Sequence, residues 1–341
     1  MHVPLWVWLV TSAVFLGLFI FDFYAHVRTP HEPTFRESGF WSAFYVALAL
    51  LFGVGMGVVW GWDHGGEYFA GYVTEKSLSV DNLFVFLIIM TKFAVPRIYQ
   101  QKVLLVGVAI ALVLRTVFIL AGAAAISAFS WVFYLFGAFL IYTAIKLARE
   151  DHDSDEPEEF KENRLVRTLR RVMPTTTIYD ADRLTTRIDG KRHITPMLIV
   201  MVAIGSTDVL FALDSIPAIF GLTKEPFIVF TTNAFALLGL RQLYFLIGGL
   251  LKRLIYLSEG LSLILAFIGV KLVLEALHTN EVPFINGGEH VAWAPEVPIW
   301  FSLSFILGTL VVATVASLLA TRRQARAAEV GASEVETPDA G

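Results

Sequence analysis

The fold is decided by Glu75-Lys-Ser-Leu-Ser-Val-Asp81-Asn82, which places two carboxylates inside an apolar run over residues 67–92. A carboxylate at bilayer depth costs several kcal/mol unless it is paired, protonated or bound to an ion. An apolar run of about 20 residues or more is long enough to cross the hydrocarbon layer as a helix. Acidic side chains in such a run therefore indicate a membrane helix with a function beyond anchoring the chain.

The composition of the 341-residue chain supports this interpretation. Hydrophobic residues make up 56% even without the 25 glycines, and charged residues make up only 16%. A soluble domain has about 45–50% apolar residues with glycine counted. Cysteine is absent, which excludes disulfides, thiolate metal sites and iron–sulfur clusters. The net charge of −4 indicates no nucleic-acid partner, and the lack of a phosphate-binding glycine loop or nucleophile elbow gives no reason to expect an enzyme.

Nine apolar runs long enough to cross a bilayer follow one another, which predicts an all-α polytopic membrane protein. They cover about residues 3–24, 40–62, 67–92, 100–124, 127–148, 195–220, 226–248, 255–277 and 297–320. The runs divide the chain into a first membrane half (1–148), a loop (149–194), a second membrane half (195–320) and a tail (321–341). We expect the loop to be a solvated cytoplasmic connector and the tail to be disordered, because both are rich in charged residues.

Lysine and arginine predict the orientation of the spans, because cytoplasmic loops carry an excess of both. With nine spans, 20 of the 26 basic residues fall in loops on one side and one, Lys224, falls on the other. The remaining five lie inside spans. We therefore expect the N-terminus outside and the C-terminus in the cytoplasm. The first run has no lysine or arginine before it, so we expect an uncleaved span there.

The second membrane half repeats the decisive stretch. The sixth run holds Asp208-Val-Leu-Phe-Ala-Leu-Asp214-Ser215, which matches the first stretch at an offset of 133. Arg115 and Arg241 match at an offset of 126, so the order of acid pair and arginine is kept. Charged residues inside spans are rare, which makes these matches informative.

The two repeat units cover 67–148 and 195–277, and each contains three spans. Lys146 and Lys271 also match, at an offset of 125. Because three is an odd number, the two units must cross the bilayer in opposite directions. The sequence therefore predicts an inverted 3+3 helix repeat, an architecture that places substrate near the midplane in many secondary transporters.

The intramembrane carboxylates, with neighbouring amide and hydroxyl oxygens, are the donors that Mn²⁺, Mg²⁺ and Ca²⁺ prefer. No histidine or cysteine inside the spans offers the donors that Zn²⁺ or copper prefers. The predicted metal ligands are Glu75, Asp81, Asn82, Asp208 and Asp214, with Ser79 and Ser215 as supporting polar groups. The expected counter-charges or gates are Arg115, Arg241 and Lys76. Structural pairing of the acids with these bases is the alternative.

The spacing of the acids leaves two arrangements open. Residues six apart lie on different faces of a regular helix, so one ion can contact both acids of a stretch only if the helix unwinds. Pro217 and Gly205 favour such a break in the sixth span. Alternatively, Asp81 and Asp214 meet across the twofold axis between the units.

When the two acidic stretches are extended to residues 75–86 and 207–220, they resemble the signature motifs of the TerC family. This family consists of integral membrane proteins of the wider LysE transporter superfamily. The resemblance runs from Pro4 to about Leu319. It implies a bacterial cytoplasmic-membrane protein from a family named for tellurium resistance, several of whose members are associated with manganese efflux and with manganese delivery to exported enzymes. The acidic motif positions of the family, which would form the ion site, match the five predicted ligands.

The expected function is secondary transport of a divalent metal, Mn²⁺ first, out of a bacterial cell, with exchange for protons. The expected partners are the metal ion, protons and the bilayer, with no bound cofactor. The alternative is a membrane scaffold in a tellurium-resistance, stress-resistance or protein-insertion complex, in which the acids only hold helices together. Handling of tellurium oxyanions is less favoured, because clustered carboxylates repel anions and cysteine is absent.

Overall fold

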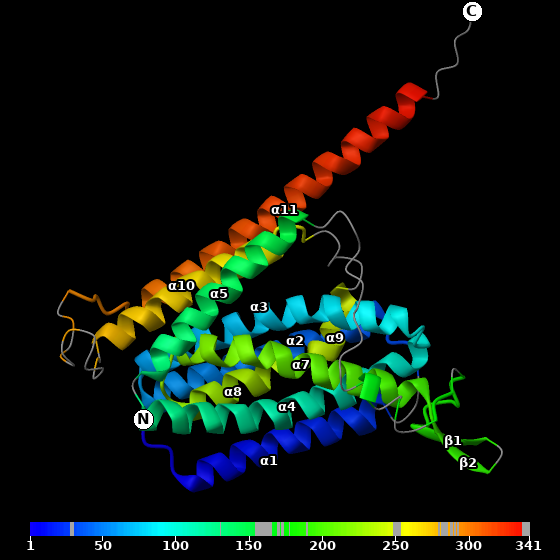
Figure 1. Ribbon diagram of the computed structural model, residues 1–341, viewed down its shortest axis with the longest axis horizontal. Helices are drawn as coiled ribbons and strands as arrows, with labels where there is room; N and C mark the ends of the chain where they lie inside the picture. The colour runs from blue at the N-terminus through cyan, green and yellow to red at the C-terminus, as the bar shows by residue number, and fades with distance from the viewer. Residues whose placement is uncertain are drawn as a thin grey trace, which may run out of the picture.

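The computed structural model describes residues 1–27, 31–129, 131–153, 166–168, 171, 174–176, 178–188, 190–247, 254–278, 280, 286, 289, 291 and 293–335, which are mostly helical (Figure 1). In chain order, the elements are α1 (Leu5–Asp22), the π-helix η1 (Phe23–Val27), α2 (Phe35–Trp60), α3 (Trp62–Lys92), α4 (Arg97–Ala128), α5 (Val132–Asp153), β1 (Thr185–Ile188), β2 (Lys191–Ile194), α7 (Pro196–Phe220), α8 (Pro226–Leu237), α9 (Leu240–Ile247), α10 (Leu257–His278) and α11 (Ile299–Val335).

An all-α polytopic membrane protein is confirmed, but fewer helices than expected are long and apolar enough to cross a bilayer. Among the described residues these are seven, namely α1, α2, α4, α5, α7, α10 and α11. The third expected span is helix α3. With 31 residues it is long enough to cross a bilayer, but its charged residues, among them Glu75, Lys76 and Asp81, make it less apolar than the seven. The seventh expected span is divided into α8, of 12 residues, and α9, of eight.

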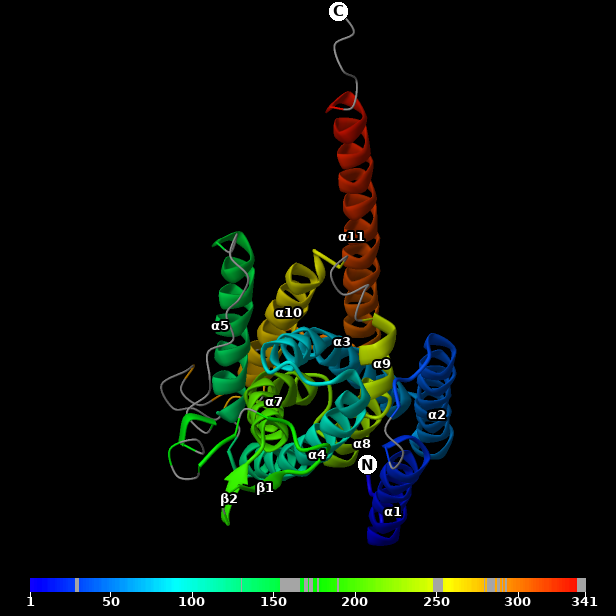
Figure 2. The same cartoon turned by 90° about the vertical axis from the view of Figure 1, so that its right-hand side faces the viewer.

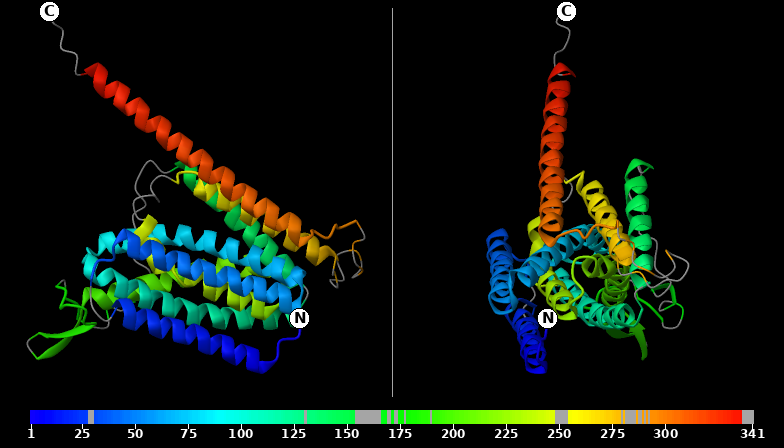
Figure 3. Two further views of the ribbon diagram at one scale, coloured as in Figure 1. Left: turned by 180° about the vertical axis from the view of Figure 1, so that it is seen from behind. Right: turned by 90° about the vertical axis from the view of Figure 1, so that its left-hand side faces the viewer.

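The helices form two groups. α1 to α4, α7 and α8 lie side by side with their axes roughly along one direction, whereas α5, α10 and α11 are inclined to them and the short α9 stands steeply to them (Figure 1). Figure 2 shows α4, α7 and α8 nearly end-on, with α5, α10 and α11 rising away from them. Figure 3 shows that α11 lies along α10 and then extends past the other helices.

Close helix packing joins the elements that carry the acidic stretches. α3 packs against α8, α4 packs against α7, and α3 also contacts α7. Between α4 and α7, a Cβ atom at Gly107 would lie 2.6 Å from Ile204, so the two helices approach at a residue without a side chain. Such packing matters in a bilayer, because lipid is as apolar as the side chains and removes the hydrophobic drive for helix association.

The second group is built on a crossing of two glycines. A Cβ atom at Gly137 on α5 would lie 2.9 Å from the carbonyl oxygen of Gly269 on α10, and a Cβ atom at Gly269 would lie 3.0 Å from the carbonyl oxygen of Gly137. Both contacts are shorter than a side chain tolerates. The α5–α10 pair therefore requires glycine at both positions, as small-residue crossings in membranes do.

A β-hairpin, formed by β1 and β2 paired antiparallel, ends the connection between the two membrane halves. The segment before it docks on the helix ends: Lys102 Nζ lies 2.5 Å from Asp182 Oδ2, and the Tyr179 hydroxyl donates to the Phe93 carbonyl at 2.8 Å. The hydrogen bond from Lys102 lowers the pKa of Asp182, and burial raises the pKa of Tyr179 to about 12. The described end of this loop is thus attached to the bundle.

The prediction of a helix break in the sixth span is wrong. α7 is continuous from Pro196 to Phe220, with Pro217 inside its last turn, where a proline removes one backbone hydrogen bond just before the helix ends. Gly205 lies in close contact with Ile110 on α4, so its missing side chain allows packing rather than unwinding. The break falls instead between α8 and α9, where Leu238 is extended and Gly239 has a φ of +77°.

The structure also differs from expectation in the tail. α11 stays helical through Val335, well past residue 321, where the disordered tail was expected to begin. The segment is rich in alanine, arginine and glutamate, which are strong helix formers. Residues 336–341 lie outside the described residues.

Candidate functional site

Two carboxylates from different helices meet at one arginine. Arg115 on α4 donates from Nε to Asp208 Oδ2 at 2.9 Å and from Nη2 to Asp208 Oδ1 at 3.1 Å. Its Nη1 donates to Glu75 Oε1 on α3. Arg115 and Glu75 are 0% exposed and Asp208 on α7 is 1% exposed. The first acids of the two repeated stretches are therefore the ones that meet, through a buried guanidinium.

Two neutral side chains complete this cluster. Asn233 on α8 donates from Nδ2 to Glu75 Oε1 at 3.1 Å, and Arg115 Nη1 donates to Ser215 Oγ on α7 at 3.2 Å. Both side chains are buried. We call Glu75, Arg115, Asp208, Ser215 and Asn233 the central cluster, to which α3, α4, α7 and α8 all contribute.

Several oxygens in and beside the central cluster are left without a hydrogen bond. Among the described residues, Glu75 Oε2, Ser79 Oγ and Asn233 Oδ1 are buried and have no hydrogen-bond partner. Ser79 follows Glu75 by four residues and lies on the same face of α3. Leaving a buried polar atom unpaired costs about 1–3 kcal/mol. With two carboxylates and one guanidinium, the cluster has a net charge of −1, so the unpaired oxygens favour a cation.

Lys76 contacts a broken helix. Its ammonium donates to the carbonyl oxygens of Ala236 at 3.0 Å and Leu238 at 3.4 Å, at the end of α8. The last carbonyls of a helix have no partner inside the helix. The positive φ of Gly239 directs the chain into α9, and Lys76 supplies the hydrogen bonds that a continuous helix would have made.

The remaining predicted ligands lie apart from the central cluster or outside the described side chains. Asp214 is half-buried and accepts a hydrogen bond at 3.1 Å from Thr143 Oγ1 on α5. Asn82 is 5% exposed, and the side chain of Asp81 is not among those described. Within the described residues, no three histidine, cysteine or acidic side chains lie close enough to hold a metal ion. A meeting of Asp81 with Asp214 stays a prediction.

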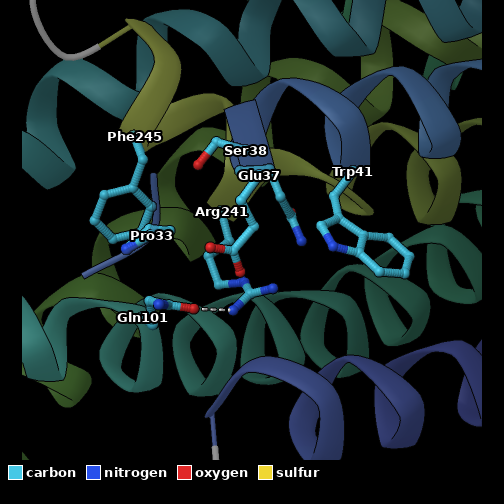
Figure 4. A pocket seen from close by; sticks show the side chains of 8 residues that line it. Pro33, Glu37, Ser38, Trp41, Gln101, Arg241 and Phe245 are labelled. Carbon is cyan, nitrogen blue, oxygen red and sulfur yellow. Dashed lines mark hydrogen bonds between the residues drawn. The ribbon is translucent and has the colours of Figure 1, made fainter. Parts of the chain in front are cut away.

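Arg241 belongs to a second buried polar group. Its Nη2 donates to Asp22 Oδ1 at the end of α1, at 2.7 Å. Its Nη1 donates to Gln101 Oε1 on α4, at 2.5 Å (Figure 4). Asp22 Oδ1 also accepts hydrogen bonds from the Tyr45 hydroxyl at 3.1 Å and from Gln242 Nε2 at 3.2 Å. This group ties α9 to α1, α2 and α4.

Beside Arg241 lies a small pocket of about 10 Å³, which has room for about one water molecule. Figure 4 shows the guanidinium of Arg241 among side chains from α2 and α4. The pocket is lined by Pro33, Glu37, Ser38, Trp41, Gln101, Arg241, Gln242 and Phe245. Although Arg115 and Arg241 match in the sequence repeat, their partners in the structure are thus different.

Sequence reasoning missed several of these polar residues, among them Asn233, Asp22 and Thr143. Asn233 follows two threonines in an otherwise apolar stretch, and Asp22 is a lone charge between phenylalanines. Both signals are visible in the sequence, because an unexplained polar residue in a span is a candidate site. Thr143 offers no such signal, because a membrane threonine can bond its own helix backbone.

Membrane-spanning helices around a buried charged cluster define a polytopic integral membrane protein with an intramembrane polar site. The chain belongs to the integral membrane protein TerC family, whose family model matches residues 60–325. This range contains the whole central cluster and Arg241, whereas Asp22 precedes it. Membership of the wider LysE superfamily stays a prediction.

Relatives are found in bacteria and in a plant chloroplast. The chain is 50% identical over 332 residues to an uncharacterized membrane protein of Mycobacterium tuberculosis, covering 97% of this chain and 83% of the relative. It is 44% identical over 245 residues to the thylakoid membrane protein TERC of Arabidopsis thaliana, covering 72% and 63%. It is 38% identical over 297 residues to Alx of Escherichia coli K12, provisionally named a membrane-bound redox modulator, covering 84% and 85%. No solved structure matches significantly.

Proposed function

We propose that this protein is a secondary transporter that exports a divalent metal, Mn²⁺ first, across a bacterial cytoplasmic membrane. The observation that carries the proposal is the central cluster, in which two buried carboxylates outnumber one guanidinium and three nearby oxygens have no hydrogen bond among the described residues. Carboxylate, amide and hydroxyl oxygens suit hard cations such as Mn²⁺ and Mg²⁺.

Arg115 acts in this proposal as a substitute for the metal. When no ion is bound, the guanidinium neutralises part of the charge of Glu75 and Asp208, which would otherwise be buried without compensation. A divalent ion that displaces the guanidinium brings two positive charges to two carboxylates. Binding of metal and binding of Arg115 are then mutually exclusive, which keeps the empty transporter stable.

The helix arrangement supports alternating access. α3 and α7 run in opposite directions, as do α5 and α10 (Figure 1). In the predicted repeat, α3 corresponds to α7 and α4 corresponds to α8. The contact of α3 with α8 is therefore the counterpart of the contact of α7 with α4, and both contacts are present. Together with the break between α8 and α9, these features are typical of inverted-repeat transporters with a midplane site.

Proton exchange provides a driving force in this proposal. The membrane potential opposes export of a divalent cation by about 2.3 kcal/mol per charge per 100 mV. The chain has no nucleotide-binding motif, and carboxylates that release metal can take up protons. The basic residues Lys92, Arg97 and Lys102, at the ends of α3 and α4, favour a cytoplasmic location for that end of the bundle.

A scaffold role is the second candidate, because ion pairs between Arg115 and both acids are also what a purely structural cluster would contain. The two candidates predict different results for a variant in which an acid is neutralised and the protein still folds. A transporter loses metal movement, whereas a scaffold never had it.

The test is the metal content of cells. Total Mn, Fe, Zn and Mg would be measured by mass spectrometry in manganese-loaded bacteria that express the wild type, Asp208→Asn or Asp81→Asn with Asp214→Asn, at matched membrane levels. We expect lower cellular Mn with the wild type only. Unchanged metal content with a well-folded wild type would reject transport and favour the scaffold.

A further inference from the structure

The end of α8 has the chemistry of a monovalent cation site. The break at Leu238 and Gly239 leaves carbonyl oxygens of the last turn without partners in the helix. The C-terminal end of a helix also carries a partial negative charge, which attracts cations. Broken membrane helices use such carbonyls to bind Na⁺ in secondary transporters. A cation is therefore expected at this position, and in this protein one is present as a side chain.

That cation is the ammonium of Lys76, which lies 3.0 Å from the carbonyl oxygen of Ala236 and 3.4 Å from that of Leu238. The backbone of Lys76 is held in place because the neighbouring residue, Glu75, is bound in the central cluster through its carboxylate. An ammonium group bears three donors and one positive charge, and it is close to K⁺ in size. The ammonium of Lys76, carried by α3, thus takes the position of a cation at the C-terminal end of α8.

Removal of the ammonium would leave the carbonyl oxygens of Ala236 and Leu238 without their side-chain donor. A monovalent cation in the same place would restore a positive partner for both oxygens.

We propose that the C-terminal end of α8 is a monovalent cation site that the ammonium of Lys76 occupies permanently. An inorganic cation such as K⁺ or Na⁺ would take the same two carbonyl oxygens and complete its shell with water if the side chain were absent. The inference deepens the proposed function, because a transporter whose monovalent site is filled by its own lysine needs no Na⁺. Protons then remain as the coupling ion.

Two substitutions distinguish a cation site from a structural lysine. Lys76→Ala removes the ammonium and leaves space, whereas Lys76→Met removes the same charge but fills the space with an apolar chain. The melting temperature of each purified variant would be measured in KCl, NaCl, ethylammonium chloride and choline chloride at one ionic strength. Choline is too large for the site and controls for general salt effects.

We expect K⁺ or Na⁺, and also ethylammonium, to raise the melting temperature of Lys76→Ala in a saturable way, with half of the effect at millimolar concentration. The melting temperatures of the wild type and of Lys76→Met should not depend on which of the four salts is present. Equal responses of Lys76→Ala to all four salts would overturn the proposal. So would a cation response in Lys76→Met as large as that in Lys76→Ala.

If Lys76→Ala yields too little protein to purify, extraction itself becomes the measurement. Detergent extracts prepared in KCl and in choline chloride would be compared by size-exclusion chromatography of a fluorescent fusion. A folded peak that appears only with the small cation supports the site, and equal peaks or none in either salt overturn it. Because no metal flux enters these measurements, they decide the cation site separately from transport.

Discussion

Arg115 and Asp208 form a two-point contact, with Nε 2.9 Å from Oδ2 and Nη2 3.1 Å from Oδ1. This geometry uses one edge of the planar guanidinium and leaves Nη1 for Glu75 and Ser215. Arg115 is therefore attached more firmly to α7 than to α3. When an ion enters, we expect the contact with Glu75 to open first, because a single nitrogen maintains it.

Substitution of Arg115 by lysine should be costly, because an ammonium cannot make a two-point contact with a carboxylate. We expect the free energy of unfolding to fall by about 2 kcal/mol, the value of a lost hydrogen bond to a charged group. The measurement is the denaturation midpoint in detergent. Arg97→Lys is the matched control, because Arg97 pairs with Glu32 at an exposed site, where such a change alters stability by about 0–1 kcal/mol. Equal losses in both variants would contradict the two-point contact as the cause.

Asp22→Asn should loosen α9 selectively. Asp22 accepts hydrogen bonds from Arg241, Gln242 and Tyr45, so its neutralisation leaves Arg241 buried with a weaker partner. We expect faster hydrogen exchange in peptides that cover 240–247, with no change in peptides from α10. Mass spectrometry of deuterated protein provides the measurement. Uniform acceleration throughout the chain would instead indicate that Asp22 supports the whole bundle.

Gly137→Ala should separate α5 from α10. A Cβ atom there would lie 2.9 Å from the Gly269 carbonyl oxygen, and overpacking of this kind costs about 1–3 kcal/mol. Gly308→Ala on α11 is the control, because no atom lies within 4 Å of its added Cβ, and alanine favours a helix over glycine. We expect a lower melting temperature for the first variant and an unchanged or higher one for the second. The same shift in both would contradict the close crossing.

Tyr179 should titrate at strongly alkaline pH. Burial raises its pKa from 10.0 to about 12, which means that the folded protein favours the neutral phenol. The resulting stabilisation is complete below pH 10 and is lost as the pH rises towards 12. The difference in absorbance at about 295 nm between the wild type and Tyr179→Phe isolates this group. A midpoint near pH 10 would show that the segment before the hairpin does not dock on Phe93.

The sequence was sufficient to identify the residues around which the fold is organised, because charges inside apolar runs have few explanations. Glu75, Asp208 and Arg115 all came from that argument, and all lie in the central cluster. The sequence could not show which acids meet. Spacing along a helix gives a face, whereas the partner across the bundle depends on packing between α3, α4 and α7.

The location of the helix break was also beyond sequence reasoning. Pro217 and Gly205 are the residues that usually interrupt a helix, yet one lies in the last turn of α7 and the other packs on α4. Leu238 and Gly239 give no signal in the sequence, because glycine is tolerated in membrane helices. The break is stabilised by Lys76 from a distant helix, and no local pattern around residue 238 could reveal that contact.

The central claim, that the buried acids carry a divalent metal, is tested most directly by flux in proteoliposomes. Entry of Mn²⁺ would be followed with a trapped metal-sensitive dye, with and without a pH gradient, for the wild type, Glu75→Gln and empty vesicles. We expect Mn²⁺ entry with the wild type that collapses with the pH gradient and is absent in folded Glu75→Gln. A wild-type rate equal to that of empty vesicles, or a Glu75→Gln rate equal to the wild type, would contradict the claim.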